Sequence, residues 1–595
     1  MMSESLYCRL CHGISRRRLP RAAALLPLLS RAVTLCGVLL LTAVLPWLSG
    51  SDPALALLRA RSGDQEATAE TLHAIRQSLG LEQGPLALMQ RWLTGLLHGD
   101  PGVSWISGRP ILGGMLQATG VSLTLMALAL LCALTVALLL SAPVLRAGLQ
   151  GRIVRSSGVL AVLFTALPEF LLASLLLIVG AVWLGLFPPY GWNGLRYAVL
   201  PALALGLPAG GYLGRIFSDA LTSAFSEAWV LAWRVAGVSR AAIALAVMKR
   251  ALPGILPLAA LVVVSLTGGA IAVEKVFAIP GLGRATLGAA MAQDLPTLQF
   301  GILLLLSLAA AASLTAGVLR RLLVGRALSG HGMPAPREEQ VRRSSSAAWL
   351  PLLCLALLAL LLLAGLPRDP LSSQFLRLQP PALSLPFGAD AMGRDLLARV
   401  AHGTLSTCLL AVAVSFICLL FGLLAGSFPR LFSGPIEVAN ALPPVIAGML
   451  VVATLGPGAE GAMIAVAAVS WAPLAAHAAA LIEEINARPY MRMLPVIGVG
   501  RRRATLCYVL PALAGPLLRH TMLRVPGIAL ALASLGFLGL GAAPPAPEWG
   551  RILAEGMPYM ERAWWGLLAP AVALALLAVL AVSSASLATG SARRQ

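Results

Sequence analysis

The sequence predicts an all-α polytopic membrane protein made of two six-helix modules, with about 12 spans of bilayer length. Composition is the first observation. Of 595 residues, 58% are hydrophobic and 11% are charged, and the mean hydropathy is +0.86. These values lie outside the range of soluble globular domains. The other two observations are a series of long apolar runs and a basic loop that recurs once in each half.

The formal charge of +20 also has to be explained. A nucleic-acid-binding protein gathers its basic residues on a soluble domain. Here the arginines are scattered through short connections between apolar runs, which is the pattern of cytoplasmic loops in membrane proteins. We therefore predict contact with the lipid bilayer and no nucleic-acid partner.

The first half begins with a basic segment, residues 1–31, which we expect to be cytoplasmic. The apolar run 32–48 could belong to a signal peptide, but it lacks a convincing small-residue cleavage site. We interpret it as a retained helix that opens the first module, residues 32–324, whose core is 115–320. The acidic segment 51–118 is expected outside. Further apolar runs lie near residues 119–142, 157–186, 197–217, 254–274 and 298–319.

A segment rich in Gly, Pro, Ser and charge, residues 325–346, is typical of a linker. The second module then covers 347–595, with a core of 402–588 and an outside segment at 367–403. Its apolar runs lie near residues 347–366, 405–427, 433–455, 460–482, 512–537 and 562–588. Because arginines fall in every second connection, we expect the linker and both termini in the cytoplasm.

Two basic stretches, 227–257 and 489–511, share one internal order. Each has a short helix-compatible piece, a glycine, and then a basic amphipathic segment that closes on Leu-Pro. Trp229 precedes Gly237 by eight residues, and Tyr490 precedes Gly498 by eight. The pattern predicts helix, break, helix, in a loop that each half presents to the same kind of partner.

Several motifs resemble the inner-membrane permeases of type I ABC importers, in the dipeptide/oligopeptide/nickel branch. The first half is similar to one permease of the usual pair through 95–100 (GLLHGD), 107–110 (SGRP), 273–284 (VEKVFAIPGLGR) and 294–296 (DLP). The second half is similar to the other through 387–395 (FGADAMGRD) and 536–550 (GFLGLGAAPPAPEWG). The resemblance covers nearly the whole chain and implies that two permeases are fused in it.

The resemblance assigns ATPase docking to the two loops. It implies docking roles for Trp229, Trp233, Arg234, Gly237, Tyr490, Arg492, Gly498 and Arg501. The family's Glu-Ala-Ala signature is replaced by Leu231-Ala232-Trp233 in one loop and by Arg492-Met493-Leu494 in the other. Pro495 also interrupts the second copy.

The Pro- and Gly-rich motifs follow the fifth apolar run of each half. Neither residue type continues a helix well. We therefore expect an irregular vestibule and gate at the outer mouth, formed by Pro280, Gly281, Gly283, Gly539, Gly541, Pro544, Pro545, Trp549 and Gly550.

The resemblance implies a permease in the bacterial inner membrane that translocates a small solute, a peptide or an opine- or nickel-type ligand, delivered by an extracytoplasmic binding protein. ATP and Mg would bind two partner ATPase subunits or one fused ATPase, so the chain itself is expected to be no enzyme and to hold no cofactor or metal. Cys8, Cys11 and His12 match a haem-attachment pattern, but the surrounding arginines predict the cytoplasmic side, so we interpret the match as coincidence.

Three alternatives remain open from the sequence. An ion-coupled secondary transporter also fits twelve spans in two halves, but it predicts carboxylates deep within the spans, and most acids here lie in loops or at span ends. An intramembrane enzyme would need paired acids or a histidine cluster. An ABC permease with a non-peptide substrate stays possible.

One further feature is the charge within the apolar run 512–537. Arg524 would lie about 18 Å along a helix from Ala512, near the middle of the bilayer. A charge there should face protein or a water-filled cavity. His520 lies four residues earlier on the same face. Either Arg524 caps a backbone carbonyl freed by Pro526, or Arg524 and His520 line the translocation path.

Overall fold

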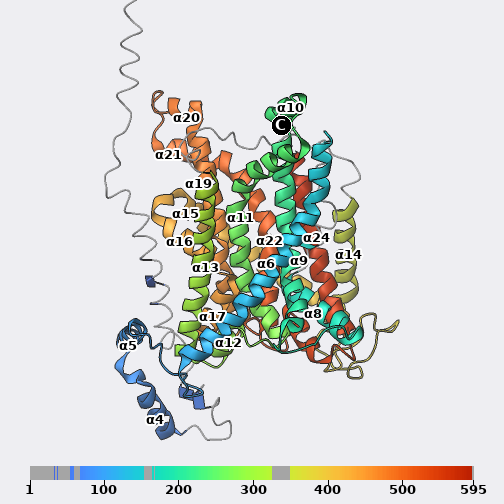
Figure 1. The fold of residues 1–595 in the computed structure, drawn as a ribbon. Helices are drawn as coiled ribbons and strands as arrows, with labels where there is room; N and C mark the ends of the chain where they lie inside the picture. Colours follow the sequence, from blue (N-terminus) through green and yellow to red (C-terminus); the bar gives the residue numbers. More distant parts are fainter. Residues whose placement is uncertain are drawn as a thin grey trace, which may run out of the picture. The chain divides into compact units, whose positions relative to one another are not determined.

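The computed structural model describes residues 68–152, 168–324 and 349–591, together with single positions between 33 and 58 and residues 164–165. Within these ranges the regular structure is helical, apart from four isolated β-bridges (Figure 1). The predicted all-α class is confirmed for this part of the chain. The N-terminal segment 1–31, most of the run 32–48 and the linker 325–346 lie outside the described residues.

The first half forms a series of helices from Ala69 to Val324. They are α4 (Ala69–Leu79), α5 (Pro85–Leu97), α6 (Ile111–Leu149), α8 (Glu169–Leu176) with a π-helical continuation (Leu177–Trp183), α9 (Leu195–Phe225), α10 (Ala228–Val235), α11 (Arg240–Val276), α12 (Leu282–Met291) and α13 (Leu295–Val324).

The second half forms a similar series. Its helices are α14 (Trp349–Gly365), α15 (Leu396–Ser427), α16 (Pro429–Ala441), α17 (Pro444–Leu455), α18 (Ala459–Ser470), α19 (Ala472–Ala487), α20 (Pro489–Met493), α21 (Arg501–Ala504), a π-helical piece (Thr505–Val509), α22 (Leu510–Leu538), α23 (Trp549–Gly556) and α24 (Trp565–Ser591).

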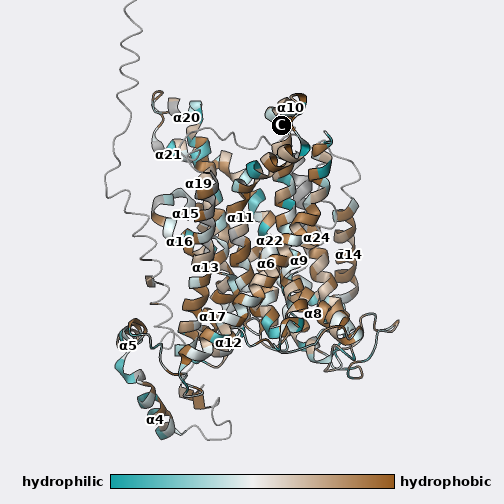
Figure 2. Ribbon diagram, in the orientation of Figure 1, coloured by the Kyte–Doolittle hydropathy of each residue, from teal (hydrophilic) through white to brown (hydrophobic). Residues whose placement is uncertain are grey.

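Six of the described helices are long and apolar enough to cross a membrane, as the brown stretches of the long helices in Figure 2 illustrate. They are Ile111–Leu149, Leu195–Phe225, Leu295–Ala312, Leu396–Ser427, Ala459–Ala487 and Arg502–Leu538. A broken pair, Leu431–Asn440 with Pro444–Leu455, makes a seventh if it is counted as one span. The apolar run 433–455 is therefore not the continuous helix that its hydropathy predicts, because Pro444 has no N–H to extend the preceding helix.

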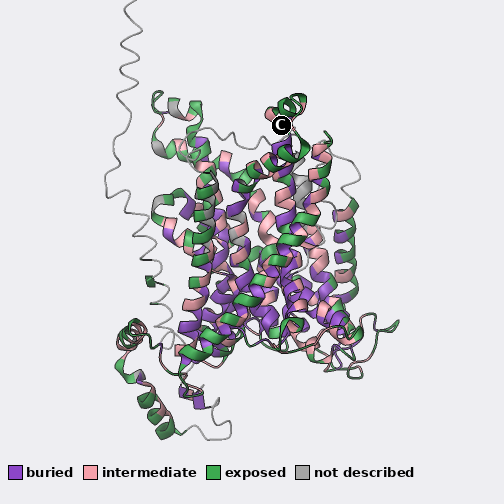
Figure 3. Cartoon of the chain, viewed as in Figure 1, coloured by how far each residue is buried: buried purple, intermediate pink, exposed green. Residues whose placement is uncertain are grey.

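The described chain falls into two compact units that do not follow the two halves of the sequence. The smaller unit contains Phe416–Asn440 and Ser470–Thr521. The larger unit contains Thr42–Ser415, Ala441–Val469 and Met522–Gln595, and so combines segments of both halves. Figure 3 shows buried residues gathered around α8, α12 and α17 of the larger unit.

Close helix packing in the larger unit joins α6 and α9. Three glycines spaced four residues apart on α9 face three buried alanines on α6: Gly206, Gly210 and Gly214 opposite Ala129, Ala133 and Ala137. A Cβ at Gly210 would lie 2.7 Å from Cβ of Val136 and 2.8 Å from the Ala133 carbonyl oxygen. Small residues at this spacing let two membrane helices approach closely.

In the larger unit, segments of the two sequence halves also contact each other. The helix α12 packs against α17, and Gln293 Nε2 donates to the Ala453 carbonyl at 3.2 Å. The Phe170 ring stacks on the Phe537 ring, with centroids 5.1 Å apart. The contact between the halves thus combines apolar packing with hydrogen bonds.

The smaller unit is built around α19. Gly422 of α15 approaches α19 so closely that a Cβ there would lie 2.8 Å from Cβ of Leu474. The rings of Phe432 and Trp471 meet edge to face, with centroids 6.4 Å apart. This unit also contains the loop with α20 and α21.

Candidate functional site

The helix α10 lies at one end of the larger unit, opposite α8 and α12 (Figure 1). The carboxylate of Glu227, just before α10, fixes its orientation: Trp229 Nε1 donates to Glu227 Oε2 at 2.7 Å, and Arg250 of α11 forms an ion pair with Glu227 Oε1 at 3.0 Å. The loop therefore has an acid in a structural role, although the Glu-Ala-Ala signature itself is missing. The sequence analysis did not assign this role to Glu227, because Arg250 lies 23 residues away.

One face of α10 is buried. Val230 packs into a cluster with Val144, Leu221, Ala224, Phe225, Ile243, Val247, Ala251 and Ile255. The Trp229 and Trp233 rings meet edge to face with centroids 5.2 Å apart. Arg234 donates to the Gly148 carbonyl at the end of α6. Contacts to α6, α9 and α11 thus hold α10 as a rigid projection of the bundle.

The opposite face of α10 is apolar and exposed. Leu231 and Val235, one turn apart on this face, have relative exposures of 64% and 83%, whereas Trp233 is 40% exposed on the flank that it shares with Trp229. Large apolar side chains grouped on one exposed face are typical of a surface that binds a protein partner. Of the predicted docking residues, Trp233 lies beside this face and is partly exposed, while Trp229 and Arg234 anchor the helix.

The break after α10 is a Schellman motif. Gly237 has a φ of +75°, in the left-handed region that glycine adopts without strain. The Gly237 N–H donates to the Arg234 carbonyl at 3.1 Å, and the Val238 N–H donates to the Trp233 carbonyl at 3.0 Å. This pair of bonds satisfies the last carbonyls of a helix.

The second loop repeats the same break. Gly498 has a φ of +80°, its N–H donates to the Pro495 carbonyl at 3.2 Å, and the Val499 N–H donates to the Leu494 carbonyl at 3.0 Å. The predicted order of helix, break and helix is therefore confirmed in both loops. The second copy is shorter, since α20 ends at Met493, just before Pro495.

The second loop also exposes apolar side chains, those of Tyr490, Met493, Val496 and Ile497. Arg488 forms an exposed ion pair with Glu484 one turn earlier, at 3.2 Å. The side chains of Arg492 and Arg501 lie outside the described part of the structure.

A buried carboxylate organises the motif at 273–284. Glu274 has no exposed surface. It accepts hydrogen bonds from Ser122 Oγ of α6 at 2.5 Å and from the Arg284 N–H in the first turn of α12 at 2.8 Å. Gly281 lies directly against this carboxylate, and a Cβ there would overlap it. Glu274 therefore caps α12, and the helix break falls at 277–281, as the Pro280-Gly281 pair predicts.

The motif at 536–550 contains a second buried carboxylate. Glu548 Oε2 accepts from the Ala542 N–H at 3.2 Å. A Cβ at Gly536 or Gly541 would lie 2.7 or 3.1 Å from its oxygens. Burial raises the pKa of Glu548 to about 7, and the Ala542 hydrogen bond and the charge of Arg551 partly oppose that rise.

Trp549 and Gly550 lock α23 in place. Trp549 is fully buried, and its Nε1 donates to the Val400 carbonyl at 3.1 Å. Gly550 approaches the Ala533 carbonyl so closely that no side chain fits between them. Gly539 supplies a left-handed residue with a φ of +87° just after α22. The exposed Pro544 and Pro545 lie on the irregular segment between α22 and α23.

Asp294 of the motif 294–296 contacts residues 104 and 105, which lie between the motifs 95–100 and 107–110. Its carboxylate accepts from Ser104 Oγ at 2.5 Å and from the Trp105 N–H at 3.0 Å. Thr297 Oγ1 also donates to it at 2.8 Å. Asp294 thereby ties the segment before α6 to the start of α13.

Lys275 joins the two halves. Its Nζ donates to the Leu538 carbonyl at 2.9 Å and to the Phe537 carbonyl at 3.2 Å. It also lies 5.8 Å from the centre of the Phe537 ring. A cation at a helix C-terminus satisfies free carbonyls and the helix dipole. The sequence analysis did not single out this residue.

The sequence analysis placed two polar residues of α22, His520 and Arg524, on a possible solute path. His520 stacks on His477 of α19 with ring centroids 4.2 Å apart, a partner that sequence spacing cannot reveal. Arg524 lies near the middle of α22 and is half-buried. Among the described residues, no group of three or more His, Cys, Asp and Glu could hold a metal ion.

Comparison with protein families decides the class of this chain. The model of the family "binding-protein-dependent transport system inner membrane component" matches residues 142–328 and again 415–590. The chain belongs to this family. The two matches fall one in each half, and each contains one of the two loops that break at Gly237 and Gly498.

Individual relatives align with one part of the chain. The di/tripeptide transport system permease protein DppC of Pseudomonas aeruginosa is 39% identical over 206 residues, which are 33% of this chain and 67% of the relative. A putative peptide transport system permease protein of Brucella abortus is 32% identical over 285 residues, 45% of this chain and 86% of the relative. The probable D,D-dipeptide transport system permease protein DdpC of Escherichia coli is 30% identical over 214 residues, 34% of this chain and 71% of the relative.

Membership places this chain in the inner membrane as a multi-pass component of a binding-protein-dependent importer. It is a permease subunit, not an enzyme, and the family binds no cofactor of its own. The predicted permease class is confirmed. The family match replaces the two alternative hypotheses, an ion-coupled secondary transporter and an intramembrane enzyme.

The Lys275 contacts generate a prediction for this permease. Replacing Lys275 with Met removes the cation from the carbonyls of Phe537 and Leu538, so the contact between the halves should loosen. Chemical cross-linking of cysteines placed at Gln293 and Ala453 should fall several-fold in Lys275→Met. Lys249→Met, which removes the other lysine of the chain at an exposed site, should leave it unchanged. Equal cross-linking yields in the parent protein, Lys275→Met and Lys249→Met would show that Lys275 does not hold the halves together.

Proposed function

We propose that this chain is a fused pair of importer permeases that moves small peptides across the bacterial inner membrane. The observation that supports it is the paired family match, one in each half, with the same Schellman break in each loop. The modules are residues 32–324 and 347–595, joined by the linker 325–346. The printed names of the relatives, di/tripeptide, peptide and D,D-dipeptide permeases, favour a peptide over an opine- or nickel-type ligand.

An uptake assay tests the solute class. A bacterial strain that lacks the genes for this chain and for its neighbouring ATPases is complemented either with the ATPase genes alone or with these genes and the gene for this chain. Only the second strain should accumulate labelled di- or tripeptides. Absence of peptide uptake, with uptake of a nickel chelate or an opine instead, would contradict the peptide assignment. In the same assay Arg524→Gln tests the proposed solute path at Arg524 and His520: loss of uptake at normal protein level supports it, and full uptake contradicts it.

The proposed topology has twelve spans with both termini in the cytoplasm. Its support is that every apolar run from 119 onward contains a described helix, and that arginines fall in alternate connections. A cysteine at Ser329, in the linker, should resist a membrane-impermeant thiol reagent in intact cells. A cysteine at Leu383, fully exposed in the segment 367–403, should react. Labelling at Ser329 would exclude this topology.

The two loops are proposed to dock on the ATPases, either two subunits or one fused chain. Each exposed apolar face is suited to fill a groove on such a partner. In the first loop, Leu231 and Val235 would enter the groove, with the partly exposed Trp233 at its edge, while the Glu227–Arg250 ion pair and the buried Val230 carry its movement to α11. Coupling of this type needs a stiff, packed connection.

The coupling proposal predicts uncoupling by Gly237→Val and Gly498→Val. A β-branched residue at a positive φ costs about 1–2 kcal/mol, so the helix break should be lost or displaced. ATP hydrolysis should continue while peptide uptake falls at least several-fold. Gly500→Val is the control, because Gly500 has no positive φ and open space around it. Normal uptake by Gly498→Val would show that the break is not part of the coupling.

The Pro- and Gly-rich motifs are proposed to form the gate at the outer mouth. In support, Gly281 and Gly283 lie against the buried Glu274, Gly541 lies against Glu548, and Trp549 and Gly550 hold the first turn of α23 against Val400 and Ala533. Lys275 links the first motif to the end of α22, so the two motifs would move together when the gate opens.

A further inference from the structure

Glu169 is an acid that lies within an apolar run, away from the loops and span ends that hold most of the other acids. It is the first residue of α8 and falls near the middle of the run 157–186. It belongs to neither the docking loops nor the gate motifs. An ionisable residue at such a depth is costly unless it faces a protein partner or water, and it usually marks a functional site.

The run that contains Glu169 is broken at Pro168. Residues 164 and 165 are helical, Pro168 has an extended ψ of 149°, and α8 begins at the next residue. The second half breaks its run at Pro443, with a ψ of 144° and the same preceding Ala-Leu pair. Broken helices of this kind, one in each half, are where many transporters build their solute sites.

The two breaks lie against one point of α11, the pair Gly268 and Gly269. A Cβ at Gly268 would lie 2.7 Å from Cβ of Pro443, and a Cβ at Gly269 would lie 3.3 Å from Cδ of the Glu169 carboxyl group. The Glu169 side chain therefore points toward α11, at a place where segments of both halves meet.

The start of α8 is enclosed by protein. Residues 170–174 are all buried, and five consecutive residues cover every face of a helix. The Phe170 ring stacks on Phe537 of the second half. Glu169 nevertheless keeps part of its surface accessible. Since α8 begins inside the bundle, this surface faces the interior and not the lipid.

The carboxylate of Glu169 has room for a ligand. Among the described residues, the one hydrogen bond to it comes from its own backbone N–H, which leaves an oxygen without a partner. That oxygen is not among the covered, unpartnered polar atoms of the described chain. It is therefore accessible.

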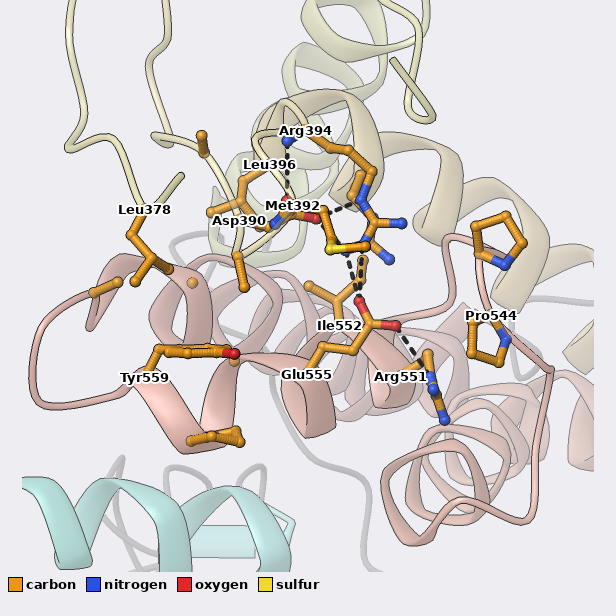
Figure 4. A pocket seen from close by; sticks show the side chains of 18 residues that line it. Leu378, Asp390, Met392, Arg394, Leu396, Pro544, Arg551, Ile552, Glu555 and Tyr559 are labelled. Atoms are coloured by element: carbon orange, nitrogen blue, oxygen red, sulfur yellow. Dashed lines mark hydrogen bonds and ion pairs between the residues drawn. The ribbon is translucent and has the colours of Figure 1, made fainter. Parts of the chain in front are cut away.

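Other charges inside the larger unit are compensated by protein. In and beside a cavity of about 460 Å³, three carboxylates lie close to three guanidinium groups (Figure 4). Arg399 Nη1, for example, contacts Asp390 Oδ2 at 2.7 Å and Glu555 Oε2 at 2.8 Å. The six groups are Asp390, Glu548, Glu555, Arg394, Arg399 and Arg551. For Glu169 the described residues supply no such cation.

We propose that Glu169 binds the protonated amine of the solute as it passes between the halves. An ammonium group donates up to three hydrogen bonds and would compensate the carboxylate. The choice of an amine rests on the proposed peptide function, because peptides carry an N-terminal amine that is mostly protonated at neutral pH. Pro444 follows Pro443 where Glu169 follows Pro168. Only the first half thus supplies an acid, so the solute would bind in one orientation.

The test uses a matched pair of probes on the purified full chain in phosphatidylcholine nanodiscs, with empty nanodiscs as the blank. L-leucyl-glycinamide carries an ammonium group, and N-acetyl-L-leucyl-glycinamide has the same skeleton without the charge. By isothermal titration calorimetry the amine should bind saturably, and at least about tenfold more tightly than the acetylated probe.

Glu169→Gln keeps the size of the side chain and removes its charge, so it should abolish the preference for the amine. Glu460→Gln makes the same change at an exposed acid in the first turn of α18, and it should retain the preference. If Glu169→Gln fails to fold, Gly269→Ala tests the same contact. The added Cβ would crowd the carboxyl group and weaken amine binding several-fold, whereas Gly288→Ala, which has open space around it, should not.

Three results would overturn the proposal. They are no saturable binding of the amine up to about 50 mM, equal binding of the two probes, or an unchanged preference in Glu169→Gln. An unchanged preference together with a lower thermal midpoint would assign Glu169 to the packing of α8 alone. Because binding is measured without transport, the two proposals fail separately. Absence of peptide uptake by the parent chain contradicts the peptide function, and uptake without an amine preference contradicts only the role of Glu169.

Discussion

A buried carboxylate needs a hydrogen-bonded partner for each of its oxygens, and this requirement shapes one end of the larger unit. Glu274 meets it with the hydroxyl of Ser122 and the N–H of Arg284. Ser122 in turn accepts the Leu282 N–H at 2.8 Å. Three helices, α6, α11 and α12, are therefore joined through one acid, and Gly281 has to be a glycine because the carboxylate occupies the space of its side chain.

The second half also buries an acid, with different residues around it. Glu548 accepts the Ala542 N–H and lies against Gly536 and Gly541, which leave room for it. Both motifs thus combine an acid with neighbouring glycines, since an acid can be buried only where the backbone offers donors at close range. The glycines of these runs therefore have a packing role as well as a conformational one.

The two loops that break at Gly237 and Gly498 illustrate a constraint of another kind. Each loop contains a left-handed glycine with the same two backbone bonds, although this glycine follows the end of α10 by two residues and the end of α20 by five. The first loop adds the Glu227–Arg250 ion pair and the anchoring of Trp229, which make α10 part of the core of the larger unit. Stiffness of this projection is what an ATP-driven movement requires if it is to reach α11.

The sequence by itself determined the features that depend on nearby residues. Long apolar runs specify helices, Gly237 and Gly498 specify helix breaks, and the Pro-Gly pair at 280–281 ends α11, because each acts on the backbone within a turn of its own position. Only the tertiary structure decided the partners that lie far apart along the chain, such as Ser104 with Asp294, Lys275 with Leu538 and Arg399 with Glu555. An ion pair or a helix cap between residues more than a hundred positions apart in the sequence depends on how the helices pack. A local sequence pattern does not predict that packing.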